Sequence, residues 1–266
     1  MNYGNSYLFI IYSGFCKIYQ FIATLYENNF LRNKSFNKNS KGFFKYKNLD
    51  LDSIEIKNVR TKFVNPYLSV REINNENLQD LTDSIFNKEF TKFIEKETGF
   101  KYSIDFVIFY DRHHIPENIK EKSTLKQYYS YKWHFDKPNS KNVLKIILPV
   151  NLEEEDASLV VFDKNRSKLI NQIDIKKKDY FKFTGCLNNI YGFMPSICWH
   201  KDQIPKKQKI CSQIMFQLNP WREWALNVDF LNKKPFINRR LNIWTNEPKF
   251  RWITLNFNKR VKLNFN

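Results

Sequence analysis

Residues 128–137 read YYSYKWHFDK, and this stretch decides which fold the rest of the chain is expected to adopt. Its aromatic residues are typical of a β-strand, and the turn-forming run at residues 137–140, KPNS, ends it. Alternate residues of a strand point to the same side, so His134 and Asp136 are expected to project together. One imidazole and one carboxylate placed in this way are two of the three ligands in a facial triad for non-haem Fe(II).

A second histidine, His200, is the candidate for the third ligand. It follows the β-like residues 197–199, and Pro205 and another apolar segment come after it. Two neutral imidazoles and a carboxylate suit Fe(II), because imidazole is a borderline ligand and Asp a hard one. Lys209 stands where the next strand is expected to begin, and its charge is a candidate to hold the distal carboxylate of a dicarboxylate ligand.

The chain after residue 100 has the texture of a β protein. Short apolar segments alternate with turn-forming residues, and we expect strands at 102–110, 143–150, 158–162, 180–184 and 210–218. Many short strands at near-regular spacing predict a β-sandwich or barrel.

Helices are expected before residue 100. Residues 1–27 have apolar residues at helical spacing, which predicts a helix packed on the domain, with contact to a membrane surface as the alternative. No Lys or Arg precedes this stretch as a secretory signal would require, and polar residues interrupt it too often for a membrane span. Residues 28–60 are expected to be loop with short structured pieces. From Asn75 an apolar stripe predicts one further helix, with Gly99 as its C-terminal cap.

The chain is strongly basic, with a formal net charge of +17. One interpretation is an anionic partner such as nucleic acid, a phosphorylated substrate or an acidic membrane surface. The other, which we favour, is a compositional bias toward Lys, Asn, Ile, Phe and Tyr, because the lysines are spread along the whole chain. Cys16, Cys186, Cys198 and Cys211 have neither zinc-type nor disulfide-scaffold spacing, and reduced thiols in a cytoplasm are expected.

Two longer segments resemble a known superfamily. Residues 133–162, WHFDKPNSKNVLKIILPVNLEEEDASLVVF, and residues 198–218, CWHKDQIPKKQKICSQIMFQL, are similar to the Fe(II)/2-oxoglutarate-dependent oxygenases. The phytanoyl-CoA dioxygenase-like branch is the most similar in its Trp-His-x-Asp, its Lys-bearing strand, its acidic turn and its distal His. The resemblance implies a mainly β fold with flanking helices around a double-stranded β-helix (jelly-roll, cupin-like) core.

The resemblance also implies cofactors and site residues. His134, Asp136 and His200 match the iron ligands, Lys209 falls at the basic position that binds 2-oxoglutarate, and O2 is the other cosubstrate. The family usually has Arg where Lys209 stands, and Arg binds a carboxylate through a fork that Lys lacks. Lys145, on the strand after His134, is therefore a second candidate for the cosubstrate. Tyr128 shares strand parity with His134 and is a third.

We predict that residues 1–100 form an N-terminal helical region, 101–220 the catalytic core and 221–266 an extension packed on it. The predicted activity is hydroxylation of a small molecule, with phosphate- or carboxylate-bearing substrates among the candidates. The carboxylate of Asp136 favours hydroxylation, because related halogenases lack it. Two alternatives stay open: a non-catalytic basic jelly roll that binds an anionic partner such as nucleic acid, and a cupin-like metal enzyme that does not use 2-oxoglutarate.

Overall fold

The structure is a computed structural model of the 266-residue chain. It describes residues 6–33, 41–48, 51, 56, 58–73, 75–120, 130–136, 140–169, 180–227 and 260–263.

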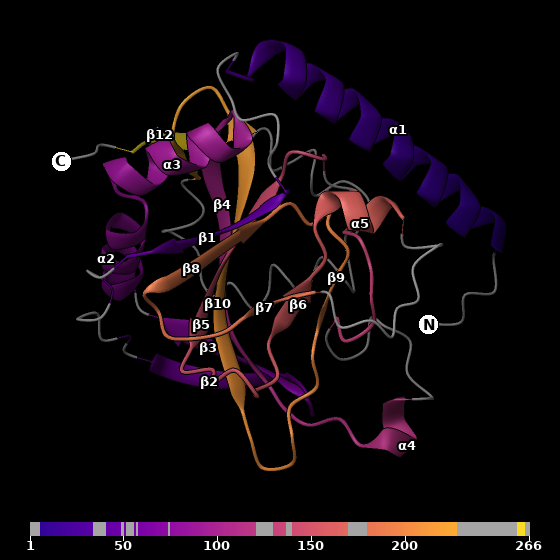
Figure 1. Cartoon of the computed structure of the whole chain (residues 1–266), viewed down its shortest axis with the longest axis vertical. Helices are drawn as coiled ribbons and strands as arrows, with labels where there is room; N and C mark the ends of the chain where they lie inside the picture. The colour runs from indigo at the N-terminus through magenta and orange to yellow at the C-terminus, as the bar shows by residue number, and fades with distance from the viewer. Residues whose placement is uncertain are drawn as a thin grey trace.

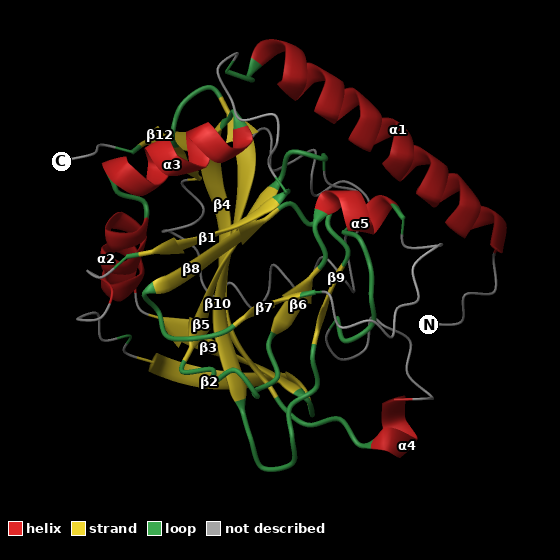
Figure 2. Ribbon diagram, in the orientation of Figure 1, coloured by secondary structure: helices red, strands yellow, loops and turns green. Residues whose placement is uncertain are grey.

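A large sheet forms the body of the molecule (Figures 1 and 2). Its strands follow in the order β1 (Phe43–Lys47), β8 (Asn189–Phe193), β5 (Leu144–Val150), β10 (Cys211–Trp221), β4 (Lys101–Arg112), β11 (Ala225–Asn227) and β12 (Arg260–Lys262). The hairpin of β2 (Asn58–Asn65) and β3 (Leu68–Ile73) joins through β3 to β4. The pairing is antiparallel throughout, except where β11 runs parallel to β4.

A small sheet faces the large one. It contains β7 (Phe181–Phe183), β6 (Leu159–Val161) and β9 (His200–Asp202), in that order. An isolated antiparallel bridge between His134 and His200 adds the segment around His134 at the β9 edge. The predicted strand at 128–137 is thus reduced, within its described part, to this single bridge.

The path of the chain between the two sheets defines the fold. From β4 the chain passes to the His134 segment in the small sheet, back to β5, to β6 and β7, to β8, to β9 and finally to β10. This alternation winds eight extended segments into two facing sheets, which is a double-stranded β-helix, or jelly roll. The predicted fold class is confirmed.

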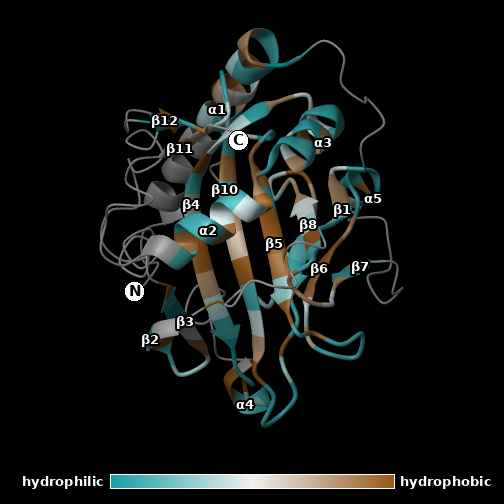
Figure 3. Ribbon diagram, turned by 90° about the vertical axis from the view of Figure 1, so that its left-hand side faces the viewer, coloured by the Kyte–Doolittle hydropathy of each residue, from teal (hydrophilic) through white to brown (hydrophobic). Residues whose placement is uncertain are grey.

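The large sheet has apolar side chains on both faces, and each face belongs to a different core. On β10, Ile214 and Phe216 point outward to the cluster beneath the helices, whereas Met215 points inward to the cluster between the sheets. This alternation follows from the two-residue repeat of a strand. Figure 3 shows the apolar middle of the sheet, with α2 (Asn75–Ile85) lying across it.

The helix expected from Asn75 is two helices. The first is α2, and α3 (Lys88–Thr98) follows after a break at which Asn87 caps the new N-terminus by accepting a hydrogen bond from Phe90 N at 2.9 Å. The Asn87 side chain thus satisfies one of the backbone N–H groups that the first turn of α3 leaves unpaired, and this favours the start of a new helix here. Gly99 ends α3 with φ 81°, in the left-handed region, as the sequence predicts.

The expected strands over 102–110, 143–150, 158–162, 180–184 and 210–218 correspond to β4, β5, β6, β7 and β10. Residues 197–199 were expected to be β-like but form turn and bend, and β9 begins only at His200. Six strands, β1, β2, β3, β8, β11 and β12, are additions to the expected set. Because β1, β2 and β3 precede residue 100, residues 1–100 are not only helical.

Strand β10 continues through Pro220, although the sequence predicts that it ends before this residue. Beyond Leu218 the strand is paired with β4 but no longer with β5. A proline is tolerated there because its missing N–H can face the unpaired side.

Helix α1 (Ser6–Phe30) lies along the outside of the molecule (Figure 1). Within the described part of the chain, no helix is long and apolar enough to cross a bilayer. Two short helices, α4 (Glu117–Lys120) and α5 (Lys164–Lys168), complete the described elements.

Candidate metal centre

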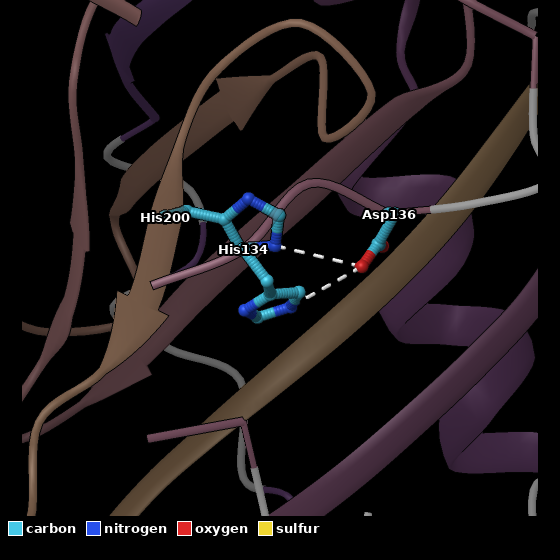
Figure 4. A group of neighbouring side chains, drawn as sticks. All are labelled: His134, Asp136 and His200. Atoms are coloured by element: carbon cyan, nitrogen blue, oxygen red, sulfur yellow. Dashed lines mark ion pairs between the residues drawn. The ribbon is translucent and has the colours of Figure 1, made fainter. Parts of the chain in front are cut away.

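The structure brings the side chains of His134, Asp136 and His200 together (Figure 4). His134 Nε2 lies 3.4 Å and His200 Nε2 3.6 Å from the same oxygen, Oδ1 of Asp136. One ligand atom from each residue can be chosen so that all three lie within 4.8 Å of one another. Two ligand atoms on adjacent octahedral positions, about 2.1 Å from a metal, lie about 3 Å apart. The three residues therefore fit one face of a metal ion after a small contraction.

Backbone pairing sets this arrangement. His134 and His200 exchange both N–H···O=C hydrogen bonds, at 3.0 and 3.1 Å, which places the two imidazoles side by side on one face. Their ring centroids are 4.3 Å apart. Asp136 is fixed by its own N–H, which donates to Pro195 O at 2.9 Å, and by its carbonyl, which accepts from Ser196 Oγ at 3.2 Å. His134 and Asp136 thus point to the same place, as predicted. They are held there by a single bridge and by the bonds to residues 195 and 196, and not by a regular strand.

The outer nitrogen of each imidazole has a hydrogen-bond partner that selects the tautomer. His134 Nδ1 lies 2.8 Å from Lys132 O, and His200 Nδ1 lies 2.9 Å from Cys198 O. A carbonyl can only accept, so both Nδ1 atoms must donate a proton. In a neutral ring this leaves the Nε2 lone pair free, and both Nε2 atoms face the carboxylate. Metal-binding histidines are commonly oriented by such a bond from the other ring nitrogen.

The charges around Asp136 favour its ionised form. Burial alone would raise the pKa of Asp136, but the Lys145 ammonium outweighs this effect and holds the pKa well below its usual range. Burial lowers the pKa of His200, so this ring favours its neutral form. Two neutral imidazole lone pairs and a carboxylate oxygen that converge on one point repel each other unless a cation lies between them.

Lys145 lies at the same site. It is on β5, with the parity of the inward-facing Ile147, and its Nζ lies 2.5 Å from Asp136 Oδ2. Lys145 thus binds the carboxylate oxygen that the imidazoles leave free. Its cross-strand partners are Gln217 and Phe193, and the Phe193 ring meets His200 edge-on with centroids 4.9 Å apart.

Lys209, the other predicted cosubstrate residue, lies elsewhere. It precedes Cys211, where β10 begins, whereas Lys145 pairs with Gln217 farther along this strand. The six residue steps from Cys211 to Gln217 span about 20 Å. The side chain of Lys209 is 41% exposed and forms an ion pair with Asp156. Asp156, in the acidic run of residues 153–156, is itself buried. The structure therefore does not bring Lys209 to the triad.

Tyr128, the third candidate for the cosubstrate, lies outside the described residues. Trp133 and Trp199, which adjoin two of the ligands in sequence, stack on each other with ring centroids 5.2 Å apart. Phe162 and Tyr180 pack against Trp133 in the same aromatic cluster.

A second polar group inside the barrel was missed from sequence. Arg112, at the end of β4, has a fully buried side chain, and its Nη1 lies 3.2 Å from Asp202 Oδ1. Its terminal nitrogens also donate to the carbonyls of Gln203 and Ala157 and to Gln213 Oε1. Asp202 is two residues after His200 on β9, so both side chains point into the barrel. The sequence could have indicated this, because Arg112 is four residues after the apolar Ile108 on one strand and therefore points to the same face.

No family model matches the sequence, and no curated protein matches it. Among solved structures, an oxidoreductase of the 2OG-Fe(II) oxygenase family from Burkholderia pseudomallei has a TM-score of 0.44 at 8% identity, over 71% of this chain and 94% of its own. Iron-bound EctD from S. alaskensis has a TM-score of 0.41 at 9% identity, over 71% of this chain and 81% of its own. HygX from Streptomyces hygroscopicus, with nickel and 2-oxoglutarate bound, has 0.40 at 6% identity, over 70% and 85%. The fold assignment above rests on the chain's own strand order.

Proposed function

We propose that the chain is a non-haem Fe(II)- and 2-oxoglutarate-dependent oxygenase, with His134, Asp136 and His200 as the iron ligands. The observation that carries this proposal is the convergence of two Nε2 lone pairs on Asp136 Oδ1, with both tautomers set by backbone carbonyls. Two imidazoles and one carboxylate on one face of a metal leave the other coordination positions open, which is the arrangement of non-haem Fe(II) oxygenases.

The composition of the site argues against a structural zinc centre. Structural zinc is held by four protein ligands, most often with cysteine among them. Among the described residues, the group that could hold a metal contains His134, Asp136 and His200 and no cysteine. A three-ligand site instead suits a reaction at the metal, where bound iron supplies O2 chemistry and the chain supplies the geometry.

Lys145 is the residue that we propose for the cosubstrate carboxylate. An ammonium has three donors, and Lys145 directs one of them to Asp136 Oδ2. Its position beside the ligand carboxylate would let a further donor hold an anionic group that approaches the open side of the triad. This proposal replaces Lys209, whose charge is engaged with Asp156 at the surface.

The barrel interior contributes by keeping water from the reacting centre. The Phe193 ring packs edge-on with the His200 ring, and Ile147, Tyr191 and Met215 belong to the same interior cluster as Phe193. Charges act more strongly in such low-dielectric surroundings than in water. His200 is buried, whereas His134 and Asp136 are half-buried, so the triad opens toward solvent on the His134 side.

The proposed reaction is hydroxylation of a small molecule. HygX has been solved with nickel, 2-oxoglutarate and hygromycin B bound, and EctD with 2-oxoglutarate and 5-hydroxyectoine. Ferrous iron requires reducing surroundings, and Cys186, Cys198 and Cys211 are free thiols.

Anaerobic loading with Fe(II) and 2-oxoglutarate, followed by a pulse of O2, tests the proposal through the succinate formed. We expect succinate from the wild-type chain and none from His200→Ala, with His113→Ala as a matched histidine control. Lys145→Met should weaken 2-oxoglutarate binding to the Ni(II)-loaded protein in calorimetry, while Lys209→Met leaves it unchanged. A wild-type chain that binds the metal but neither binds nor consumes 2-oxoglutarate would instead be the metal enzyme without this cosubstrate.

A further inference from the structure

Helix α1 presents a broad apolar surface to solvent. Its outer face contains large side chains that recur at helical spacing and are 47 to 75% exposed, namely Ile18, Phe21, Ile22, Leu25, Tyr26 and Phe30. We call these six residues the α1 face. Isolated exposed apolar residues are common, but a continuous row of six on one helix marks an interaction surface.

The opposite side of α1 is polar and holds the helix on the barrel. Glu27 Oε2 accepts hydrogen bonds from Ser140 Oγ at 2.7 Å and Asn142 Nδ2 at 2.8 Å. Thr24 Oγ1 accepts from Lys141 N at 3.0 Å. Thr24 and Glu27 are three residues apart, so they lie on one side of the helix.

This arrangement reverses the usual polarity of a surface helix, which buries its apolar stripe and exposes its polar one. The hydrogen bonds to residues 140–142 fix the rotation of α1 about its axis. The outward direction of the α1 face is thus imposed by specific contacts. A helix that is held in this way is suited to insert its apolar side into a second phase.

The charge of the chain indicates which phase that is. With a net charge of +17, two copies repel each other, which disfavours the α1 face as a self-association surface. The same charge attracts an anionic surface. Lys17 on α1 and Lys141, which adjoins the helix through its bond to Thr24, are both exposed. No acidic side chain is among the six residues of the α1 face.

We propose that the α1 face docks the protein on an anionic phospholipid surface, with α1 lying in the plane of the interface. From Ile18 to Phe30 the face is about 18 Å long. Apolar insertion and electrostatic attraction act together in this type of binding, and each alone is weak. The docking surface is independent of the metal centre.

Vesicle co-sedimentation of the full chain tests this proposal. We expect binding to phosphatidylcholine vesicles that contain about 30% phosphatidylserine, because this anionic lipid gives the vesicle a negative surface potential. Vesicles of pure phosphatidylcholine should bind far less, and added salt should weaken the interaction by screening. The triple variant Phe21→Gln, Ile22→Gln, Leu25→Gln should bind roughly 100-fold more weakly.

Matched controls distinguish binding through the α1 face from nonspecific binding through other exposed apolar residues. Phe63 and Val261 are 59% and 54% exposed on other elements, and Phe63→Gln, Val261→Gln should bind like the wild type. Lys17→Glu should weaken binding to the anionic vesicles several-fold without changing the fold. The proposal is overturned if the wild type stays unbound with anionic vesicles, or if the triple variant binds as well as the wild type. It is also overturned if the α1 face instead mediates a dimer, seen as a concentration-dependent mass that the triple variant loses.

Discussion

Asp136 and Asp202 are two carboxylates that point into the same barrel, each beside a cation, yet their surroundings differ. Asp202 pairs with the fully buried Arg112, whose terminal nitrogens also have carbonyl and amide partners. Asp136 has Lys145 on one oxygen, while two imidazole lone pairs face the other. We call Arg112–Asp202 the closed pair, because its cation and carboxylate bind groups of the chain itself. We call Lys145–Asp136 the open pair, because it has acceptors in excess and, as we propose, binds a cation from outside.

The largest expected effect concerns the closed pair. Arg112→Leu leaves Asp202 buried without its cation, and we expect the free energy of unfolding to fall by about 3–5 kcal/mol. Urea denaturation measures this change. Adding Asp202→Asn to the same variant should restore part of the loss, because the uncompensated charge is then removed. A loss below about 1 kcal/mol would mean that the pair is not closed in the way described.

The open pair should respond to metal instead. At a free metal concentration 100 times the dissociation constant, the wild-type chain should gain about 2.7 kcal/mol of unfolding free energy. His200→Ala should gain far less at the same concentration, and Arg112→Leu should keep the gain if it remains folded. Thermal unfolding with and without a redox-stable ion such as Ni(II) gives this comparison, and equal gains in wild type and His200→Ala would contradict it.

A third carboxylate, Glu27, shows what burial does when the partners are neutral. Burial raises the pKa of Glu27 to about 7, against the hydrogen bonds from Ser140 and Asn142. Between the unfolded and folded pKa values the folded chain binds more protons, so this group lowers stability as pH rises from about 4.5 to 7. Glu27→Gln should therefore stabilise the protein by up to about 3 kcal/mol at pH 8 and by about 1 kcal/mol at pH 5. An equal effect at both pH values would contradict the raised pKa.

The smallest effect is expected at the surface pair. Lys209→Met removes the partner of Asp156 in a half-exposed ion pair, and such pairs add little to stability. Metal and 2-oxoglutarate binding should both stay at wild-type levels. A large loss of 2-oxoglutarate binding in this variant would return Lys209 to the site and contradict the assignment of Lys145.

The fold could be predicted because its signal is local. Apolar segments bounded by turn residues, such as β4 and β5, are visible in the sequence, and their spacing indicates a β-sandwich or barrel. The jelly roll was implied by the family resemblance. Strand β8, NIYGF, was missed because it is short and contains Gly192. The structure explains this glycine, because a Cβ there would lie 2.0 Å from an atom of the Phe44 ring on β1. A contact between strands so distant in sequence has no local signature.

The pairing of His134 with Asp136 could likewise be predicted from a local signal. The choice among the basic residues near the triad could not. His134 and Asp136 are two residues apart, so their shared direction follows from backbone geometry alone. Lys209, Lys145 and Arg112 could be ranked only by knowing strand register, which depends on long-range pairing such as that of Lys145 with Gln217. The tautomer-setting carbonyls of Lys132 and Cys198 are backbone groups and leave no trace in the residue types.

Anaerobic titration of Fe(II) into the metal-free chain measures whether His134, Asp136 and His200 bind a metal. We expect one ion per chain, with affinity at least about 100-fold lower in each of His134→Ala, Asp136→Ala and His200→Ala. The variant His113→Ala, which removes a histidine outside the triad, should bind as the wild type does. Wild-type affinity in two of the three triad variants, or no binding by the wild-type chain, would contradict the claim that these lone pairs converge on a metal.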